Sequence, residues 1–212
     1  MGDKDVKYIY AHNFSGFDGI FLLRHLLNYD GGEIKPLIFN GKLMAINFKF
    51  TDPSSVDNTE NNTENKDNKN KTKARTLVFK DSFLLLPLSL RKLCKAFNVS
   101  TVKTHFPFLL TDINYSGKFP AFDLYTDLSK QEYFDIKYDF NDQTWSFREE
   151  AIKYCGIDCK ALFEVLISFN NLIFNQFKLN IHSSFTLPSL AMKIYKTPPK
   201  KLVFLGVFYI FS

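Results

Sequence analysis

The chain has 212 residues, which is enough for one domain or a large part of one. Hydrophobic residues make up 45% of the chain, so it can bury a real core, and its formal net charge of +5 is compatible with a polyanionic partner. No apolar stretch reaches the length of a membrane span, because the run 202–211 covers only half of one, and we expect no membrane partner. The three cysteines, in a chain with no signal peptide, indicate reduced thiols inside a cell or organelle and make a poor zinc site.

The first part of the chain alternates strand and helix patterns. Residues 7–11 are predicted to form a short buried strand, and residues 17–28 an amphipathic helix. The apolar stripe of this helix consists of Phe17, Ile20, Phe21, Leu23 and Leu27. The turn signal Asn40-Gly41-Lys42 predicts a hairpin of strands 34–40 and 43–50, and a return strand is expected over 76–80.

A polar segment interrupts this pattern. Between Val56 and Ala74 there is no apolar residue, only Asn, Thr, Lys, Glu and Asp. Such a composition cannot bury enough surface to offset the entropy of ordering the chain. We expect residues 52–75 to form a disordered insertion with no function of its own.

The second part of the chain is mainly helical. Ser89 is expected to cap a helix that ends near Phe97, and Ser129 a helix over 131–137. Residues 99–108 are predicted to be extended, and 109–127 to be a loop. A long helix begins at Phe147 or Arg148 and ends near residue 177. A last helix begins at Thr186 or Pro188, and Pro198-Pro199 ends it. Alternating strands and helices predict the α/β class.

Tyr154 and Asp158 lie four residues apart on the predicted long helix, and therefore on one face of it. A phenol there can hold a water and a carboxylate can hold a divalent metal, so together they can present a metal-bound hydroxide to a phosphodiester. The alternative is a tyrosine packed on the core and an ordinary helical carboxylate. This pair alone does not decide between the two.

A second motif lies where the first strand meets the first helix, a junction at which α/β sheets bind their ligands. It runs Tyr10-Ala11-His12-Asn13-Phe14-Ser15-Gly16-Phe17-Asp18-Gly19-Ile20-Phe21. Asn13 can hydrogen-bond a nucleotide, Phe17 and Phe21 can stack on bases, and Asp18 can bind a metal. The alternative is an asparagine turn followed by an ordinary amphipathic helix.

Taken together, the motifs resemble those of family B DNA polymerases. His12-Asn13 with Phe17-Asp18 is similar to the second exonuclease motif, and Tyr154-x3-Asp158 to the third. The segments that resemble the protein-primed branch, encoded by mitochondrial genomes and linear plasmids, are Asp81-Ser82 with Leu86-Pro87 and Ser89-Leu90, Trp145 to Cys159, and Thr186 to Ala191. The resemblance covers nearly the whole chain, from Tyr8 to Thr197.

The resemblance implies a ribonuclease-H-like 3′–5′ exonuclease fold over residues 1–197, an unmatched tail over 198–212, and a DNA polymerase attached to the domain. In this family, divalent metals (Mg²⁺ or Mn²⁺) held by four carboxylates cleave the terminal phosphodiester. Asp18 and Asp158 match metal-binding carboxylates. Tyr154 matches the tyrosine that orients the attacking water, and Lys103 a lysine that assists catalysis. The positions that match single-stranded-DNA contacts are Tyr10, His12, Asn13, Phe17, Phe21 and Ser82.

Two features of the family are missing from the sequence. The first exonuclease motif, Asp-x-Glu, belongs tens of residues before Asn13, and Asp3-Lys4-Asp5 is too close to replace it. The polymerase palm that follows the exonuclease domain is also absent. We therefore expect a fragment of a polymerase reading frame, truncated at both ends, with the first strands of its fold missing, an incomplete two-metal site and no activity alone.

Two alternatives remain open at this point. One is a stand-alone metal-dependent nuclease that recovers its missing ligands from Asp3 and Asp5 or from another chain. The other is a non-catalytic single-stranded-DNA-binding remnant, or the product of a decaying gene. The resemblance also implies a mitochondrial location, encoded in the organelle or on a plasmid, and a terminal protein as primer of the full enzyme.

Overall fold

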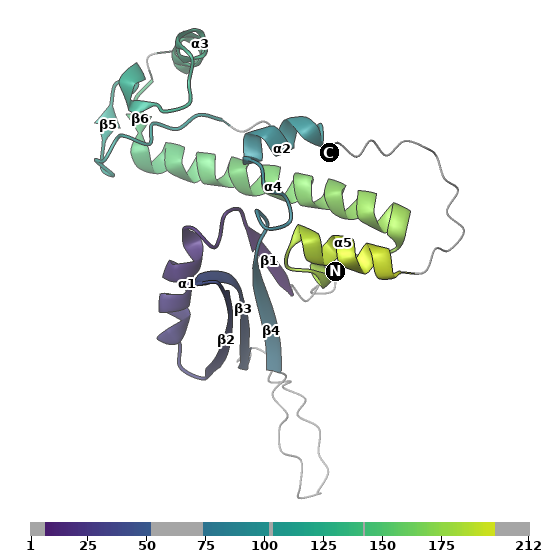
Figure 1. Ribbon diagram of the computed structural model, residues 1–212. Coiled ribbons are helices and arrows are strands. Elements are labelled where there is room, and N and C mark those ends of the chain that lie inside the picture. Colours follow the sequence, from purple (N-terminus) through teal and green to yellow (C-terminus); the bar gives the residue numbers. More distant parts are fainter. Residues whose placement is uncertain (1–6, 52–73, 102–103, 142, 198–212) are drawn as a thin grey trace, which may run out of the picture. The chain divides into compact units, whose positions relative to one another are not determined.

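The computed structural model (Figure 1) describes residues 7–51, 74–101, 104–141 and 143–197. The chain divides into two compact units. The first takes in the described residues up to Leu86 and from Ile173 onward, and the second takes in Pro87–Leu172. The expected insertion 52–75 lies outside the described residues except for Ala74 and Arg75, and the expected tail 198–212 lies outside them entirely.

The first unit is built on a sheet of four strands in the order β1-β4-β3-β2 (Figure 1). The strands are β1 (Tyr8–Ala11), β2 (Gly32–Phe39), β3 (Lys42–Thr51) and β4 (Ala74–Asp81). β4 pairs antiparallel with β3 and parallel with β1, with Ala11 opposite Asp81. The carboxyl ends of β1 and β4 therefore finish beside each other.

The predicted hairpin is confirmed, as β2 and β3 pair antiparallel on either side of Asn40-Gly41. Asn40 has φ 48° and Gly41 has φ 72°, the left-handed backbone that a two-residue hairpin turn requires. β4 begins two residues before the expected return strand, because Arg75 pairs with Phe50 and Ala74 with Thr51.

Helix α1 (Asp18–Leu27) confirms the first predicted helix, but it buries a different face from the one we expected. The expected stripe is largely exposed, with Phe17 at 64% and Phe21 at 72%. The face that packs on the core cluster of the sheet consists of Gly19, Leu22, Leu23 and Leu26. Apolar residues lie all round this helix, so their period could not select a face, whereas packing on β3 does.

The opposite face of β1 and β4 contacts the 3₁₀ helix η3 (Ile181–Ser183), and helix α5 (Leu187–Lys196) follows η3 in the chain. Alternate residues of a strand face opposite sides. Ala11 and Phe79 pack with the α1 cluster, whereas Tyr10 and Lys80 hydrogen-bond to His182 in η3. The Thr186 hydroxyl accepts a hydrogen bond from the Ser189 N–H and caps α5 at the start we predicted.

The second unit contains short elements and most of one long helix. These elements are α2 (Leu90–Ala96), β5 (Ser116–Gly117), η2 (Phe122–Leu124), α3 (Lys130–Phe140), β6 (Trp145–Ser146) and α4 (Phe147–Phe177). Ser129 caps α3 as predicted, in a capping box with Glu132. Ser89 precedes α2 as predicted, but its side chain makes no capping hydrogen bond.

The long helix α4 is confirmed over the predicted range, and its residues from Ile173 onward belong to the first unit. Within the second unit its Glu164 carboxylate accepts hydrogen bonds from the N–H (3.0 Å) and hydroxyl (2.8 Å) of Thr101. Among the described helices, none is long and apolar enough to cross a membrane. The mixed sheet with its flanking helices confirms the predicted α/β class.

Candidate functional site

The carboxyl ends of β1 and β4 are joined through one buried carboxylate, that of Asp81, which is only 2% exposed. Its Oδ2 accepts a hydrogen bond from the Ser15 N–H at 2.9 Å, and its Oδ1 accepts one from the Phe83 N–H at 2.9 Å. A buried carboxylate that accepts two backbone N–H groups is strongly held. Asp81 therefore fixes the β1–α1 loop against the end of β4.

Ser82 extends this connection to His12. The Ser82 hydroxyl donates to the Ala11 carbonyl at 3.1 Å, and His12 Nδ1 lies 3.0 Å from Ser82 Oγ. Because the hydroxyl proton already goes to Ala11, the oxygen accepts from His12, which places the imidazole proton on Nδ1. Two of the predicted DNA-contacting residues are thus held to each other.

The other predicted DNA contacts near β1 follow in the same loop and at the start of α1. Asn13 has φ 62°, and its carbonyl accepts a hydrogen bond from the Gly16 N–H at 3.0 Å, which closes a tight turn. Phe17, Asp18 and Phe21 come next and are exposed. We refer to His12, Asn13, Phe17, Asp18, Phe21, Asp81 and Ser82 as the strand-end site.

Tyr10 points to the other face of the sheet and is tied to η3. Its hydroxyl lies 3.1 Å from His182 Nδ1, and the His182 ring stacks on Tyr8 with centroids 4.7 Å apart. Burial raises the pKa of Tyr10 and, together with the nearby Lys80 ammonium, lowers the pKa of His182. Tyr10 therefore remains a neutral phenol at physiological pH.

Lys80 is a buried cation beside this pair, with 3% of its surface exposed. Its ammonium donates to the carbonyls of His182 (2.6 Å) and Ser184 (3.0 Å) and lies 4.3 Å from the Phe185 ring centroid. Burial, with a smaller effect of Lys193, lowers the pKa of Lys80 to about 8. Lys80 thus binds η3 to the sheet next to the strand-end site.

The sequence analysis missed the roles of Lys80, Asp81 and His182. The role of Asp81 could have been found, because Asp81 follows a strand predicted to lie in the same sheet as residues 7–11. His182 carries no such signal, since 172 residues separate it from Tyr10 and only the folded chain brings the two together.

In the second unit, Tyr154 and Asp158 lie on α4 as predicted, and both side chains are half-buried. The Tyr154 ring packs against Phe106 and Phe108, with centroids 5.4 Å and 5.6 Å away. Because both residues lie in one continuous helix, they share a face of it as predicted. Their catalytic role stays a prediction. The predicted assisting residue Lys103 lies outside the described residues.

The residues that the structure describes do not by themselves fit the expected two-metal site. Within 7–51, 74–101, 104–141 and 143–197, no group of three or more His, Cys, Asp and Glu side chains is placed to hold a metal ion. A catalytic metal needs a fixed set of ligands. Asp18 begins α1 and Asp158 lies in α4. Asp3 and Asp5 lie outside the described residues.

Comparisons with known proteins point to one family. The family of organellar and viral type B DNA polymerases matches residues 2–205. A probable DNA polymerase of Neurospora intermedia is 36% identical over 198 residues, which cover 89% of this chain and 19% of that protein. A probable DNA polymerase of Ascobolus immersus is 32% identical over 201 residues, which cover 90% of this chain and 15% of that protein.

Among solved structures, the phi29 DNA polymerase complexed with single-stranded DNA is similar to 88% of this chain, which corresponds to 25% of that chain. The sequence identity is 20% and the TM-score is 0.43. The chain thus spans about a fifth of the length of the curated relatives it matches, between 15% and 21%.

Proposed function

The chain belongs to the organellar and viral type B DNA polymerases, and from this premise we propose that it forms the part of such an enzyme that holds the 3′ end of single-stranded DNA for 3′–5′ proofreading. On this proposal its fold is the ribonuclease-H-like exonuclease fold. The family membership agrees with the resemblance carried by the motifs around Asp18 and Asp158.

The strand-end site is the observation that carries the proposal. Exposed Phe17 and Phe21 stand next to a loop whose polar groups are already fixed by Asp81 and Ser82. Single-stranded DNA is bound by aromatic side chains on which bases stack, together with polar and basic groups along the backbone. The site offers exposed aromatic rings beside polar groups of a fixed loop, and preorganised groups lose little entropy on binding.

On this proposal, polymerase activity belongs to a longer enzyme of which this chain forms one part. That enzyme is a DNA-directed DNA polymerase that replicates mitochondrial or plasmid DNA, uses Mg²⁺ or Mn²⁺ and accepts a terminal protein as primer. A divalent metal would supply a bound hydroxide and stabilise the charge on the phosphate. Asp18 and Asp158 would contribute carboxylates, and the remaining ligands would come from residues other than those described.

For the isolated chain we expect DNA binding without cleavage. The test is incubation of the purified chain with 3′-labelled single-stranded DNA and Mg²⁺ or Mn²⁺, beside the variant Asp158→Ala. No release of label above that of the variant is expected. Release that Asp158→Ala abolishes would contradict this expectation and support the stand-alone nuclease.

A further inference from the structure

Two exposed thiols, those of Cys155 and Cys159, lie four residues apart on α4. The third cysteine of the chain, Cys94 in α2, is buried. Each residue of a helix turns by about 100°, so side chains four residues apart are separated by only about 40° around the axis. The Cys159 thiol is hydrogen-bonded to the Cys155 thiol. The two sulfur atoms therefore form one pair on the surface of the helix, which we call the thiol pair.

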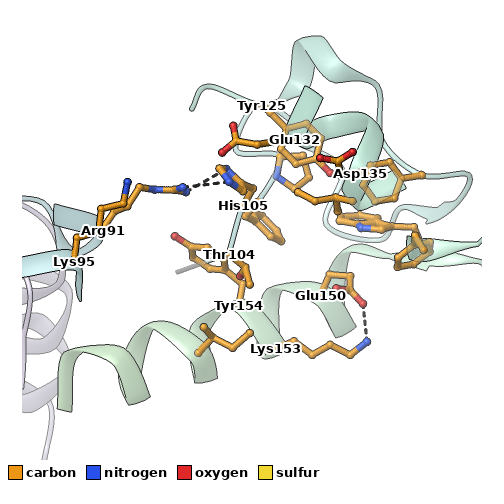
Figure 2. A pocket seen from close by; sticks show the side chains of 17 residues that line it. Arg91, Lys95, Thr104, His105, Tyr125, Glu132, Asp135, Glu150, Lys153 and Tyr154 are labelled. Carbon is orange, nitrogen blue, oxygen red and sulfur yellow. Dashed lines mark hydrogen bonds and ion pairs between the residues drawn. The ribbon is translucent and has the colours of Figure 1, made fainter. Parts of the chain in front are cut away.

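The thiol pair lies on a different side of α4 from Tyr154. Tyr154 lines a cavity of about 600 Å³ in the second unit, and Figure 2 shows its ring pointing toward the other side chains of that cavity. Neither thiol is among the described residues that line it. Cys159 is turned by about 140° from Tyr154 around the helix axis. The thiol pair is thus separate from the cavity and from the strand-end site.

Apolar side chains flank the thiol pair along the helix. Ile152 precedes Cys155 by three residues, Phe163 follows Cys159 by four, and both are largely exposed. Residues at these spacings are neighbours on one face of a helix. Sulfur ligands between apolar side chains favour a soft, weakly hydrated ion, whereas hard ions such as Mg²⁺ retain their water and take oxygen ligands.

The spacing of the thiol pair suits a bridging metal ion better than a disulfide bond. A disulfide needs Cβ atoms about 3.5–4.5 Å apart, whereas residues four apart on a helix have Cβ atoms about 5–6 Å apart. Two sulfur atoms that share a metal ion, with bonds of about 2.3 Å as for zinc, can lie up to about 4.6 Å from each other. Burial and the Cys155 thiol raise the pKa of Cys159, which disfavours the free thiolate needed for disulfide formation. A metal ion displaces the thiol proton itself.

The number of available ligands selects the metal. Structural zinc takes four ligands. In the part of the chain that the structure describes, however, no group of three or more His, Cys, Asp and Glu side chains could hold a metal ion. Cu(I) is a soft ion that thiolates select, and two thiolates in a linear arrangement are enough to bind it. A reducing compartment, which the sequence indicates from its cysteines, also keeps copper as Cu(I).

We propose that Cys155 and Cys159 bind one Cu(I) ion on the exposed side of α4. Both thiols release their protons on binding, so two thiolates and one monovalent cation leave the site with a net negative charge. The bound ion would close the helical turn that contains Gly156 and Asp158. The site does not depend on the proposed function, because neither thiol belongs to the strand-end site.

The test uses the full chain with reduced thiols under anaerobic conditions. Cu(I) is supplied as its coloured complex with the chelator bicinchoninate, and the loss of colour measures the Cu(I) that the protein removes from the chelator. We expect the chain to remove one Cu(I) per molecule. No removal of Cu(I) from the chelator would overturn the proposal.

Single substitutions locate the ion. Cys155→Ser and Cys159→Ser should each weaken Cu(I) binding at least about tenfold, because each removes one of two ligands. Cys94→Ala, at the buried thiol, is the control and should leave the stoichiometry and the affinity unchanged. Unchanged binding in either serine variant would overturn the proposal. So would an equal loss in Cys94→Ala, with circular dichroism showing a folded chain.

A double variant tests the helical spacing of the two ligands. Cys159→Ser combined with Lys160→Cys keeps the number of thiols, but it places the second thiol about 140° from Cys155 around the helix axis. Its Cu(I) binding should be as weak as that of Cys159→Ser alone. Binding as tight as that of the unchanged chain would show that any two thiols suffice, and would contradict a site built on one face of α4.

Discussion

The strand-end site of the first unit and the aromatic rings around Tyr154 in the second unit are held in place in different ways. In the first unit a buried carboxylate and a serine fix a polar loop by hydrogen bonds, and the aromatic rings of Phe17 and Phe21 stand exposed beside it. In the second unit the aromatic rings pack on one another and line a cavity of about 600 Å³. The comparison shows that hydrogen bonds to buried polar groups order one region, whereas packing of aromatic rings orders the other.

The largest expected loss of stability follows from removing the Asp81 carboxylate, which holds the loop of the strand-end site. Asp81→Ala leaves the N–H groups of Ser15 and Phe83 without their acceptor, and we expect a loss of about 3 kcal/mol in the free energy of unfolding. Urea denaturation measures it, with Asp30→Ala, at an exposed aspartate of the same unit, as control. A loss as small as that of the control would show that the loop is held by other contacts.

Gly19 and Gly156 differ in how closely other atoms approach them in their helices. A Cβ on Gly19 in α1 would lie 2.8 Å from the Phe14 carbonyl oxygen, whereas a Cβ on Gly156 in α4 would meet no atom within 4 Å. Gly19→Ala should therefore cost about 2 kcal/mol, and Gly156→Ala should stabilise the chain by about 0.5–1 kcal/mol. Thermal unfolding of both variants tests this, and a shift of the same sign in both would contradict the packing described for α1.

The contribution of the exposed rings of α1 can be tested by binding of single-stranded DNA. Phe21→Ala removes an exposed ring, and we expect about fivefold weaker binding of a labelled oligonucleotide, the lower end of the effect of a stacked base. Fluorescence anisotropy measures it, with Leu27→Ala as the control, since Leu27 is a similarly exposed apolar residue at the far end of α1. An equal loss in both would mean that α1 contributes only general apolar surface.

A further prediction concerns pH and the buried Lys80. Burial lowers the pKa of Lys80 from its ordinary value of 10.5 to about 8 in the folded chain. Between these two pH values the unfolded chain therefore binds more protons than the folded chain. The free energy of unfolding should therefore rise with pH in this window, relative to the variant Lys80→Met, which keeps the neighbouring groups His182, Lys193 and Tyr8. Urea denaturation across pH 8 to 10 measures the difference. A constant difference across the window would mean that Lys80 keeps its ordinary pKa in the folded chain.

Local signals in the sequence were sufficient to predict most of the helices and strands of this protein. The turn Asn40-Gly41 predicted the hairpin, Ser129 and Thr186 predicted the starts of their helices, and the periodic run after Phe147 predicted α4. The spacings around Asp18 and Asp158 pointed to the polymerase family that the comparison supports. These features depend on residues close together in the chain, so a sequence pattern determines them.

Tertiary structure determined which face of α1 is buried, the burial of Lys80 and the packing of aromatic rings around Tyr154. Each depends on residues far apart in the sequence, such as Lys80 with His182, and chain entropy opposes such contacts until the whole unit has folded. In α1, apolar residues on several faces left the choice to the sheet beneath the helix. The sequence alone therefore determined the elements and the family, whereas packing determined which side chains became available to a ligand.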